Sequence, residues 1–182
     1  MTGRYGARVT TTDDRSFPAA LAALDGIEFP FEDGPGSIDY EPYGEFDSAE
    51  KTTEWLRLWT GNEDLDGDAF RVFAQDGTGG LVASWLVRPG RPPADQPVVF
   101  FGSEGETGVV AGSLGEFLWL LAGGVGPMEA VEFGSEQGEP HAALRAVAEE
   151  HSGIEPRTPA DVLAAARAEF PDFSDMVSSW CR

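Results

Sequence analysis

Short apolar segments separated by glycine-rich turns are the feature that most constrains the fold of this chain. Glycine is abundant between them, at 76–80 and 102–108, and it accepts the backbone angles that tight hairpin turns require. The segment 81–87 is apolar at both alternating sets of positions, which is typical of a central strand. We therefore predict four consecutive antiparallel strands in a meander, over residues 70–74, 81–87, 98–101 and 109–111.

Helix signals lie on both sides of these strands. Ser113 and Glu116 have the spacing of a capping box, and Thr158-Pro159 is a typical helix start. Trp55, Leu58 and Trp59 recur at helical spacing, which predicts that they share one apolar face. Helices are predicted over 17–24, 49–60, 114–122, 140–151 and 159–169. The expected fold class is α+β, an antiparallel β-meander sheet flanked by helices.

The length of 182 residues fits one domain. An apolar fraction of 41% and an aromatic fraction of 11% provide a core that disordered acidic chains lack. Residues 1–15 are polar and show no hydrophobic period, so we expect a flexible N-terminus followed by a single domain over 16–182.

Charge excludes several classes of partner. The chain has 12 Lys and Arg against 32 Asp and Glu, a formal net charge of −20, and Lys51 is its single lysine. Nucleic acids and anionic membranes are bound mainly through basic side chains, so neither is expected as a partner. The longest apolar run, 117–122, is far shorter than the ~20 residues of a membrane-spanning helix. A single cysteine, Cys181, and no signal-like start predict a cytoplasmic location.

The acidic residues are concentrated in one part of the sequence. Between Asp25 and Asp68 there are 14 acidic and 2 basic residues, a net charge of 2 − 14 = −12. One interpretation is a solvated face that keeps the protein soluble. The other is a docking surface for a basic protein, because clustered charge of one sign accelerates association.

The segment 62–68 alternates oxygen-bearing side chains in the manner of the first half of an EF-hand loop. An EF-hand requires a bidentate glutamate at its twelfth position, which is Phe73 here, so a polar turn is predicted and a weak cation site is the alternative. His141 and His151 are too far apart for a metal pair on one helix face. We expect no metal and no cofactor.

The sequence offers little catalytic chemistry. Ser103 and Ser135 follow glycine, but neither lies in a Gly-x-Ser-x-Gly motif. Cys181 lies beside the last residue. We predict that the protein is not an enzyme, and a hydrolase with an unrecognised carboxylate pair is the less favoured alternative.

Residues 70–122 resemble the SUKH superfamily. The similarity lies in Phe70-Arg71-Val72-Phe73, the turn Gln75-Asp76-Gly77-Thr78-Gly79-Gly80, a strand with Trp85, the strand Val98-Val99-Phe100-Phe101 and the helix Phe117-Leu118-Trp119-Leu120-Leu121. The resemblance implies an antiparallel sheet flanked by helices. It also implies structural roles for Asp76, Gly77, Gly79 and Gly80 in the first turn and for Trp85 in the core. Many bacterial members are immunity proteins that neutralise toxins, often nucleases or deaminases, and fungal relatives are regulatory proteins.

The resemblance and the charge together predict a non-catalytic immunity protein that binds a basic toxin domain. A cytosolic regulatory or scaffold protein without a toxin partner is the alternative. Aromatic side chains at Tyr40, Tyr43, Trp55 and Trp59 are candidate anchors, because such residues dominate binding hot spots. The predicted partner-binding rim consists of Glu63, Asp64, Asp66, Asp68, Asp76, Glu104 and Glu106.

Overall fold

A computed structural model describes residues 15–29, 37–136 and 138–182 of the chain. The predicted flexible segment 1–15 lies outside these residues, apart from Arg15. Arg15 is anchored to the domain, because its Nε donates to the carbonyl oxygen of Phe46 at 2.7 Å and its guanidinium pairs with Glu45. Arg15 therefore packs against the domain, although it lies one residue before the predicted start of that domain.

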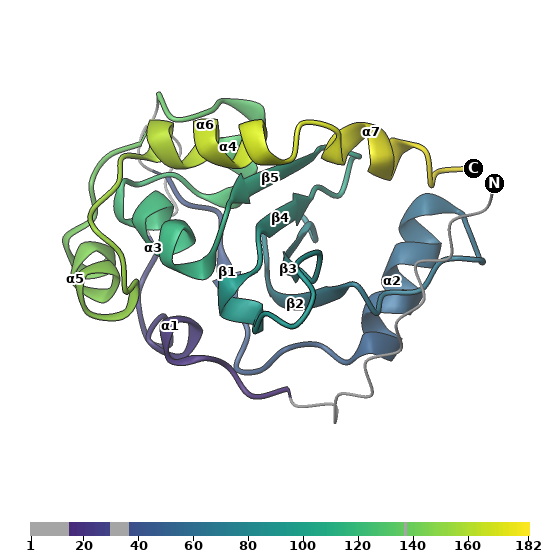
Figure 1. Ribbon diagram of the computed structural model, residues 1–182, viewed down its shortest axis with the longest axis horizontal. Helices are drawn as coiled ribbons and strands as arrows, with labels where there is room; N and C mark the ends of the chain where they lie inside the picture. Colours follow the sequence, from purple (N-terminus) through teal and green to yellow (C-terminus); the bar gives the residue numbers. More distant parts are fainter. Residues whose placement is uncertain (1–14, 30–36, 137) are drawn as a thin grey trace.

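A five-stranded antiparallel sheet forms the centre of the molecule, with its strands in chain order (Figure 1). The predicted meander is confirmed, and β3 is the central strand. β1 was not predicted, since it is two residues long, includes Pro42 and lies at the sheet edge, where proline is tolerated. The strands are β1 (Glu41–Pro42), β2 (Phe70–Gln75), β3 (Leu81–Trp85), β4 (Val98–Phe101) and β5 (Thr107–Ala111).

All five predicted helices are present, as α1 (Ala19–Ala22), α2 (Ala49–Thr60), α3 (Leu114–Ala122), α5 (Ala142–His151) and α6 (Pro159–Glu169). The sequence did not predict α4 (Pro127–Glu132), α7 (Phe173–Ser178) or the 3₁₀ turn η1 (Pro93–Asp95). These elements are too short to show a hydrophobic period. In the described part of the chain, no helix has the length and apolarity needed to cross a bilayer.

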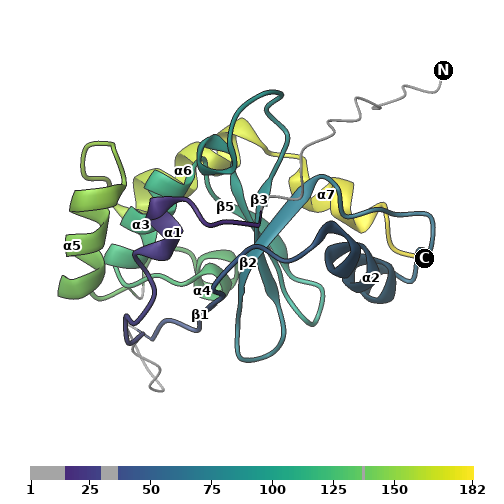
Figure 2. The same ribbon diagram turned by 90° about the horizontal axis from the view of Figure 1, so that it is seen from below.

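Each face of the sheet carries its own hydrophobic core. Neighbouring residues of β4 point to opposite faces, so Phe100 belongs to one core and Phe101 to the other. The Phe100 core includes residues of α1, α3 and α5, and the Phe101 core includes residues of α2 and α7. In Figures 1 and 2 these two groups of helices lie at opposite ends of the molecule, with the sheet between them. α6 contacts β5, the edge strand opposite β1.

The predicted apolar face of α2 is wrong at Leu58, whose surface is 85% exposed. Leu56 is the buried leucine of this helix, and Trp55 and Trp59 are half-buried against Phe101. Two residues along a helix correspond to a rotation of roughly 200°, so burying Leu56 turns Leu58 towards solvent. Spacing alone did not distinguish these two leucines.

The β2–β3 turn has the glycine-dependent geometry that the resemblance implies. Gly79 has φ of +93°, a conformation that favours glycine. A Cβ on Gly80 would lie 2.9 Å from the carbonyl oxygen of Phe101. Trp85, at the end of β3, is half-buried, and its ring centroid lies 5.3 Å from that of Phe170 and 5.1 Å from that of Phe173. These residues have structural roles here.

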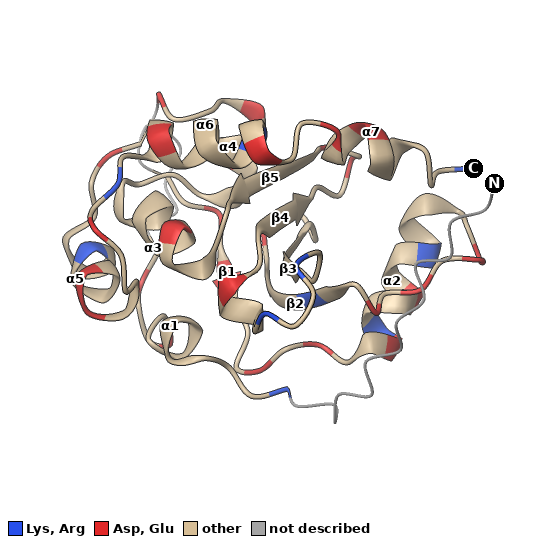
Figure 3. Ribbon diagram, in the orientation of Figure 1, with Lys and Arg blue, Asp and Glu red and all other residues tan. Residues whose placement is uncertain are grey.

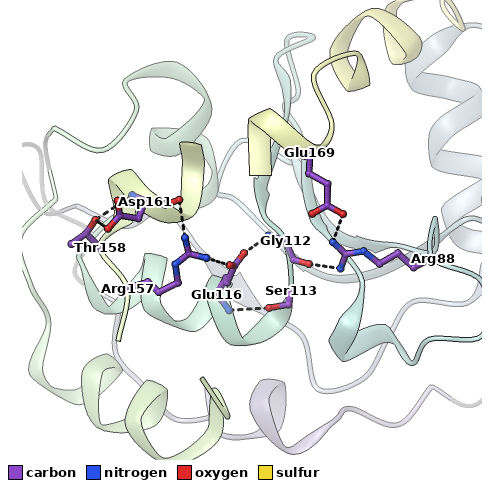
Figure 4. Close-up of polar contacts among 8 residues, drawn as sticks. All are labelled: Arg88, Gly112, Ser113, Glu116, Arg157, Thr158, Asp161 and Glu169. Atoms are coloured by element: carbon purple, nitrogen blue, oxygen red, sulfur yellow. Dashed lines mark hydrogen bonds and ion pairs between the residues drawn. The ribbon is translucent and has the colours of Figure 1, made fainter. Parts of the chain in front are cut away.

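A network of charged side chains joins the start of α3 to both ends of α6 (Figure 4). Glu116 accepts from the amide of Gly112 at 2.8 Å and pairs with Arg157, and Arg88 joins the carbonyl of Gly112 to Glu169. Only one half of the predicted capping box forms, because Ser113 accepts from the Glu116 amide while the Glu116 carboxylate bonds to Gly112. Since each charge in the network has an opposite charge beside it, we assign the network a structural role.

Candidate functional site

A pocket of about 240 Å³ opens between α2, the β4–β5 turn and α7. Its walls come from three segments that are distant in the sequence. It combines an aromatic ring, hydroxyl groups, a carboxylate and a thiol, and none of the described lysine, arginine or histidine side chains lines it. The lining residues are Trp59, Ser103, Glu104, Gly105, Thr107, Val177, Ser178 and Cys181.

Hydrogen bonds attach the β4–β5 turn to both helices. The indole Nε1 of Trp59 donates to the carbonyl oxygen of Gly102 at 2.9 Å. On the other side, the Ser174 hydroxyl donates to the carbonyl oxygen of Thr107 at 2.8 Å. Beneath the turn, the ring of Phe101 contacts Trp59 and the first residue of α7. Hydrogen bonds and ring contacts between packed elements therefore hold the walls of the pocket together.

The acidic loop, which we define as residues 62–68, lies beside the C-terminal end of the chain. The Asn62 amide nitrogen donates to the carbonyl oxygen of Trp180 at 2.9 Å, and Asp64 forms an ion pair with Arg182 at 2.6 Å. Figure 3 shows acidic positions along this loop and along α7. Because Cys181 lines the pocket, the same terminal segment connects the acidic loop to the pocket.

Most of the predicted rim is accessible. Glu63, Asp64, Asp66 and Asp68 are exposed on the acidic loop. Glu104 is exposed and Glu106 is half-buried on the β4–β5 turn. Within the described residues, Asp64 is the member of this set that has a salt-bridge partner. The tertiary structure thus places uncompensated acidic side chains on the β4–β5 turn, which lines the pocket, and on the acidic loop, which contacts the C-terminal segment that includes Cys181.

Asp76 is separate from this rim, because its side chain is buried and only 2% exposed. Its Oδ1 accepts hydrogen bonds from the Thr78 amide at 2.9 Å, the Thr78 hydroxyl at 2.8 Å and the Gly80 amide at 2.7 Å. These bonds stabilise the β2–β3 turn, the structural role that the resemblance implies. We therefore correct the predicted rim by removing Asp76.

The concentration of acids between Asp25 and Asp68 does not form one acidic face. Asp39 and Asp47 are buried. Asp47 pairs with Lys51 at 2.8 Å, and Glu45 pairs with Arg15. Several acidic residues of this region are therefore buried or paired within the fold. The exposed acids of the region that have no salt-bridge partner include those of the acidic loop other than Asp64.

The acidic loop has the structure of a polar turn. Asn62 accepts from the Asp64 amide at 3.1 Å and Asp66 accepts from the Asp68 amide at 3.2 Å, so the loop oxygens bond to the loop backbone. A strand, β2, follows the loop where an EF-hand has a helix. Among the residues with a described position, no three His, Cys, Asp or Glu side chains converge as metal ligands.

The two histidines lie at opposite ends of α5. His141 caps the start of this helix, and its Nδ1 accepts from the Leu144 amide at 3.3 Å. His151 is the last residue of the helix. The structure therefore does not bring them together.

A second group of carboxylates lies near the β2–β3 turn, outside the pocket. The Asp39 amide donates to Glu129 Oε1 at 3.3 Å, and Asp39 Oδ1 accepts from the Gly77 amide at 2.7 Å. Burial raises the pKa of both carboxyl groups, and the charge of Asp76 raises them further. One oxygen of Glu129 and one of Asp76 are buried without a hydrogen-bond partner. The pKa values of Asp39 and Glu129 are therefore raised because packing buries these carboxyl groups and places other carboxylates beside them.

Replacing Glu129 with glutamine should stabilise the protein at pH 7. A carboxyl group with a raised pKa in the folded state binds its proton more tightly there than in the unfolded chain, so its contribution to stability is lost as pH rises through the folded pKa. Glutamine removes the buried charge and retains an oxygen to accept from the Asp39 amide. Thermal unfolding should show a higher melting temperature for the variant at pH 7, and a smaller difference at pH 4.

Glu132→Gln is the matched control, because Glu132 is exposed on the same helix, α4. Its melting temperature should follow that of the wild type at both pH values. A Glu129→Gln variant that is less stable than wild type at pH 7 would show that the charged form of this group supports the fold.

Comparison of the chain with protein-family models, curated proteins and solved structures gave no match. The proposal that follows therefore starts from the geometry of the pocket and of the acidic side chains near it.

Proposed function

We propose that this chain is a non-catalytic binding protein that uses the acidic rim of its pocket to bind a basic protein partner. This rim is the predicted one without Asp76: the acidic side chains of the acidic loop together with Glu104 and Glu106. The observation that carries this proposal is the placement of uncompensated acids on the β4–β5 turn that lines the pocket and on the acidic loop that contacts the adjoining C-terminal segment. Such an arrangement is suited to recognition, because it adds electrostatic attraction to a surface of fixed shape.

Electrostatics favours a partner of opposite charge. The chain has a formal net charge of −20, and the rim has exposed acids at Glu63, Asp66, Asp68 and Glu104 without salt-bridge partners among the described residues. At about 0.1 M salt, charges act over roughly 10 Å, so neighbouring acids of one rim combine in attracting a basic surface. The chief effect expected is faster association.

The pocket provides a place for specific contact beside this charge. Trp59 forms part of its wall, and tryptophan is enriched among the residues that dominate binding energy. The Trp59 ring is held by its bond to Gly102 and by stacking on Trp55, with ring centroids 5.5 Å apart. A side chain that is fixed before binding loses less conformational freedom when a partner arrives.

The resemblance to the SUKH superfamily supports a toxin as this partner. The observed fold, an antiparallel sheet flanked by helices, is of the kind that the resemblance implies. Under this proposal the protein acts in the cytoplasm as an immunity protein and covers a basic toxin domain of the nuclease or deaminase type. A regulatory protein of the same family would use the same surface without a toxin.

Reversing the charge of the acidic loop tests the proposal. The triple variant Glu63→Lys, Asp66→Lys, Asp68→Lys should associate about tenfold more slowly at low salt with a basic toxin domain encoded beside its gene. The control triple variant, Glu132→Lys, Glu139→Lys, Glu155→Lys, changes net charge equally at exposed positions outside the rim. Stopped-flow association at two salt concentrations measures both variants, and circular dichroism checks their folding.

Two results would contradict the proposal. Equal association rates for the two triple variants would place the interface elsewhere. A wild-type chain that neither binds the adjacent toxin domain nor rescues cells expressing it would exclude the immunity function.

A further inference from the structure

We infer that the pocket between α2, the β4–β5 turn and α7 binds the side chain of a single arginine from the partner. This inference deepens the proposed function and rests on it. It identifies the chemical group that the site recognises, which surface charge alone does not do.

The polar groups of the pocket suit a cation. Glu104 contributes a carboxylate at its rim, and Ser103 and Ser178 contribute hydroxyl oxygens that can accept hydrogen bonds. The Ser103 hydroxyl proton is directed to Thr78, at 2.9 Å, so its oxygen retains capacity to accept. Among the residues with a described position, no basic side chain lines the pocket, so its known walls place no positive charge against an incoming cation.

The apolar groups of the pocket suit the rest of an arginine side chain. Trp59 and Val177 form an apolar wall against which methylene groups can lie. A planar guanidinium stacks on indole rings and also forms paired hydrogen bonds to a carboxylate, whereas a lysine ammonium acts as a point charge. The combination of Trp59 with Glu104 therefore favours arginine over lysine.

The size of the pocket favours one side chain over a small-molecule substrate. Its volume of about 240 Å³ lies below the about 300–1,000 Å³ that is typical of small-molecule and cofactor sites. Its walls also lie beside the acidic loop, on the surface that the proposed function assigns to the partner. An arginine projecting from a basic protein meets both conditions.

Cys181 allows occupancy to be measured in the natural chain. It is the single cysteine of the sequence, it is exposed, and it lines the pocket. Methanethiosulfonate reagents modify such a residue when its thiolate attacks the reagent's sulfenyl sulfur, forming a mixed disulfide and releasing methanesulfinate. A ligand in the pocket should slow this reaction by covering the sulfur.

The test uses the full chain without its partner. N-acetyl-arginine amide, at millimolar concentration, should slow modification of Cys181 by a neutral methanethiosulfonate reagent and shift the Trp59 indole N–H signal in NMR spectra. N-acetyl-citrulline amide has a similar shape without the charge, and it should do neither. Glu104→Gln should weaken both effects of the arginine probe at least several-fold, whereas Glu132→Gln, at an exposed acid on α4 outside the rim, should leave them unchanged.

Equal effects of the arginine and citrulline probes, no effect of either, or full retention of the effects in Glu104→Gln would overturn the inference. These results are independent of the proposed function. If the charge-reversed acidic loop still slows toxin association while the probes fail, the binding function stands and the arginine site does not. If the probes succeed and the toxin does not bind, the site remains and its partner is another basic protein.

Discussion

Replacing Phe101 with alanine should lower the free energy of unfolding by about 3–5 kcal/mol, the usual cost of truncating a buried phenylalanine. Phe101 is 2% exposed and lies where three elements meet. Its ring contacts Trp59 of α2, Phe70 of β2 and Phe173 of α7, with centroids 6.0, 5.2 and 5.9 Å away. Alanine would leave a cavity bordered by aromatic rings that cannot all move inward. Urea denaturation measures this loss.

Leu58→Ala is the control for this variant, because Leu58 lies on α2 with its side chain exposed. Its free energy of unfolding should stay within about 0.5 kcal/mol of wild type. Phe101→Ala should also loosen the pocket, which would appear as a changed rate of Cys181 modification under conditions where the protein remains folded. A loss of stability below about 1 kcal/mol would mean that the surrounding rings close the cavity.

Replacing Asp76 with alanine should lower the free energy of unfolding by about 3 kcal/mol. The reason is that leaving a buried amide without its charged acceptor costs about 1–3 kcal/mol of stability. The carboxylate Oδ1 accepts the amide protons of Thr78 and Gly80, and the Gly80 bond is buried. Alanine removes both bonds together with the bond from the Thr78 hydroxyl. Urea denaturation should show a shifted midpoint with an unchanged slope.

Two further variants separate the turn role of Asp76 from a partner-binding role. Asp76→Asn retains an acceptor oxygen and should lose less stability than Asp76→Ala. Glu104→Ala, on the neighbouring exposed turn, should be close to wild type in stability. If Asp76→Ala unfolds like wild type yet binds the toxin domain more weakly, Asp76 belongs to the rim after all.

Elements with strong local signals could be predicted from the sequence to the residue. The bounds of α2, α3, α6 and β4 match their predictions, because caps such as Ser48, Ser113 and Thr158, and the glycines that follow α2, α3 and β4, act over a few residues. The caps accept from the Lys51, Glu116 and Asp161 amides, as local geometry requires.

Elements whose stability comes from distant contacts could not be predicted. β1 exists through its pairing of Glu41 with Gln75 and Pro42 with Ala74. α7 is stabilised by Phe173 and Val177, which join a core formed with α2 and β4. Two-residue strands and six-residue helices bring too few local interactions to be stable alone.

The acidic composition, the meander of hairpin strands and the capped helices follow from the sequence by itself, because charge is additive and hairpin and cap signals are local. The tertiary structure alone decides which acids are functional candidates. Packing buries Asp76 in a turn and leaves Glu104 exposed on the neighbouring one. It also brings Trp59, Glu104 and Cys181 into one pocket. The physical reason is that exposure and proximity are set by contacts between residues far apart in the chain, which neither composition nor spacing encodes.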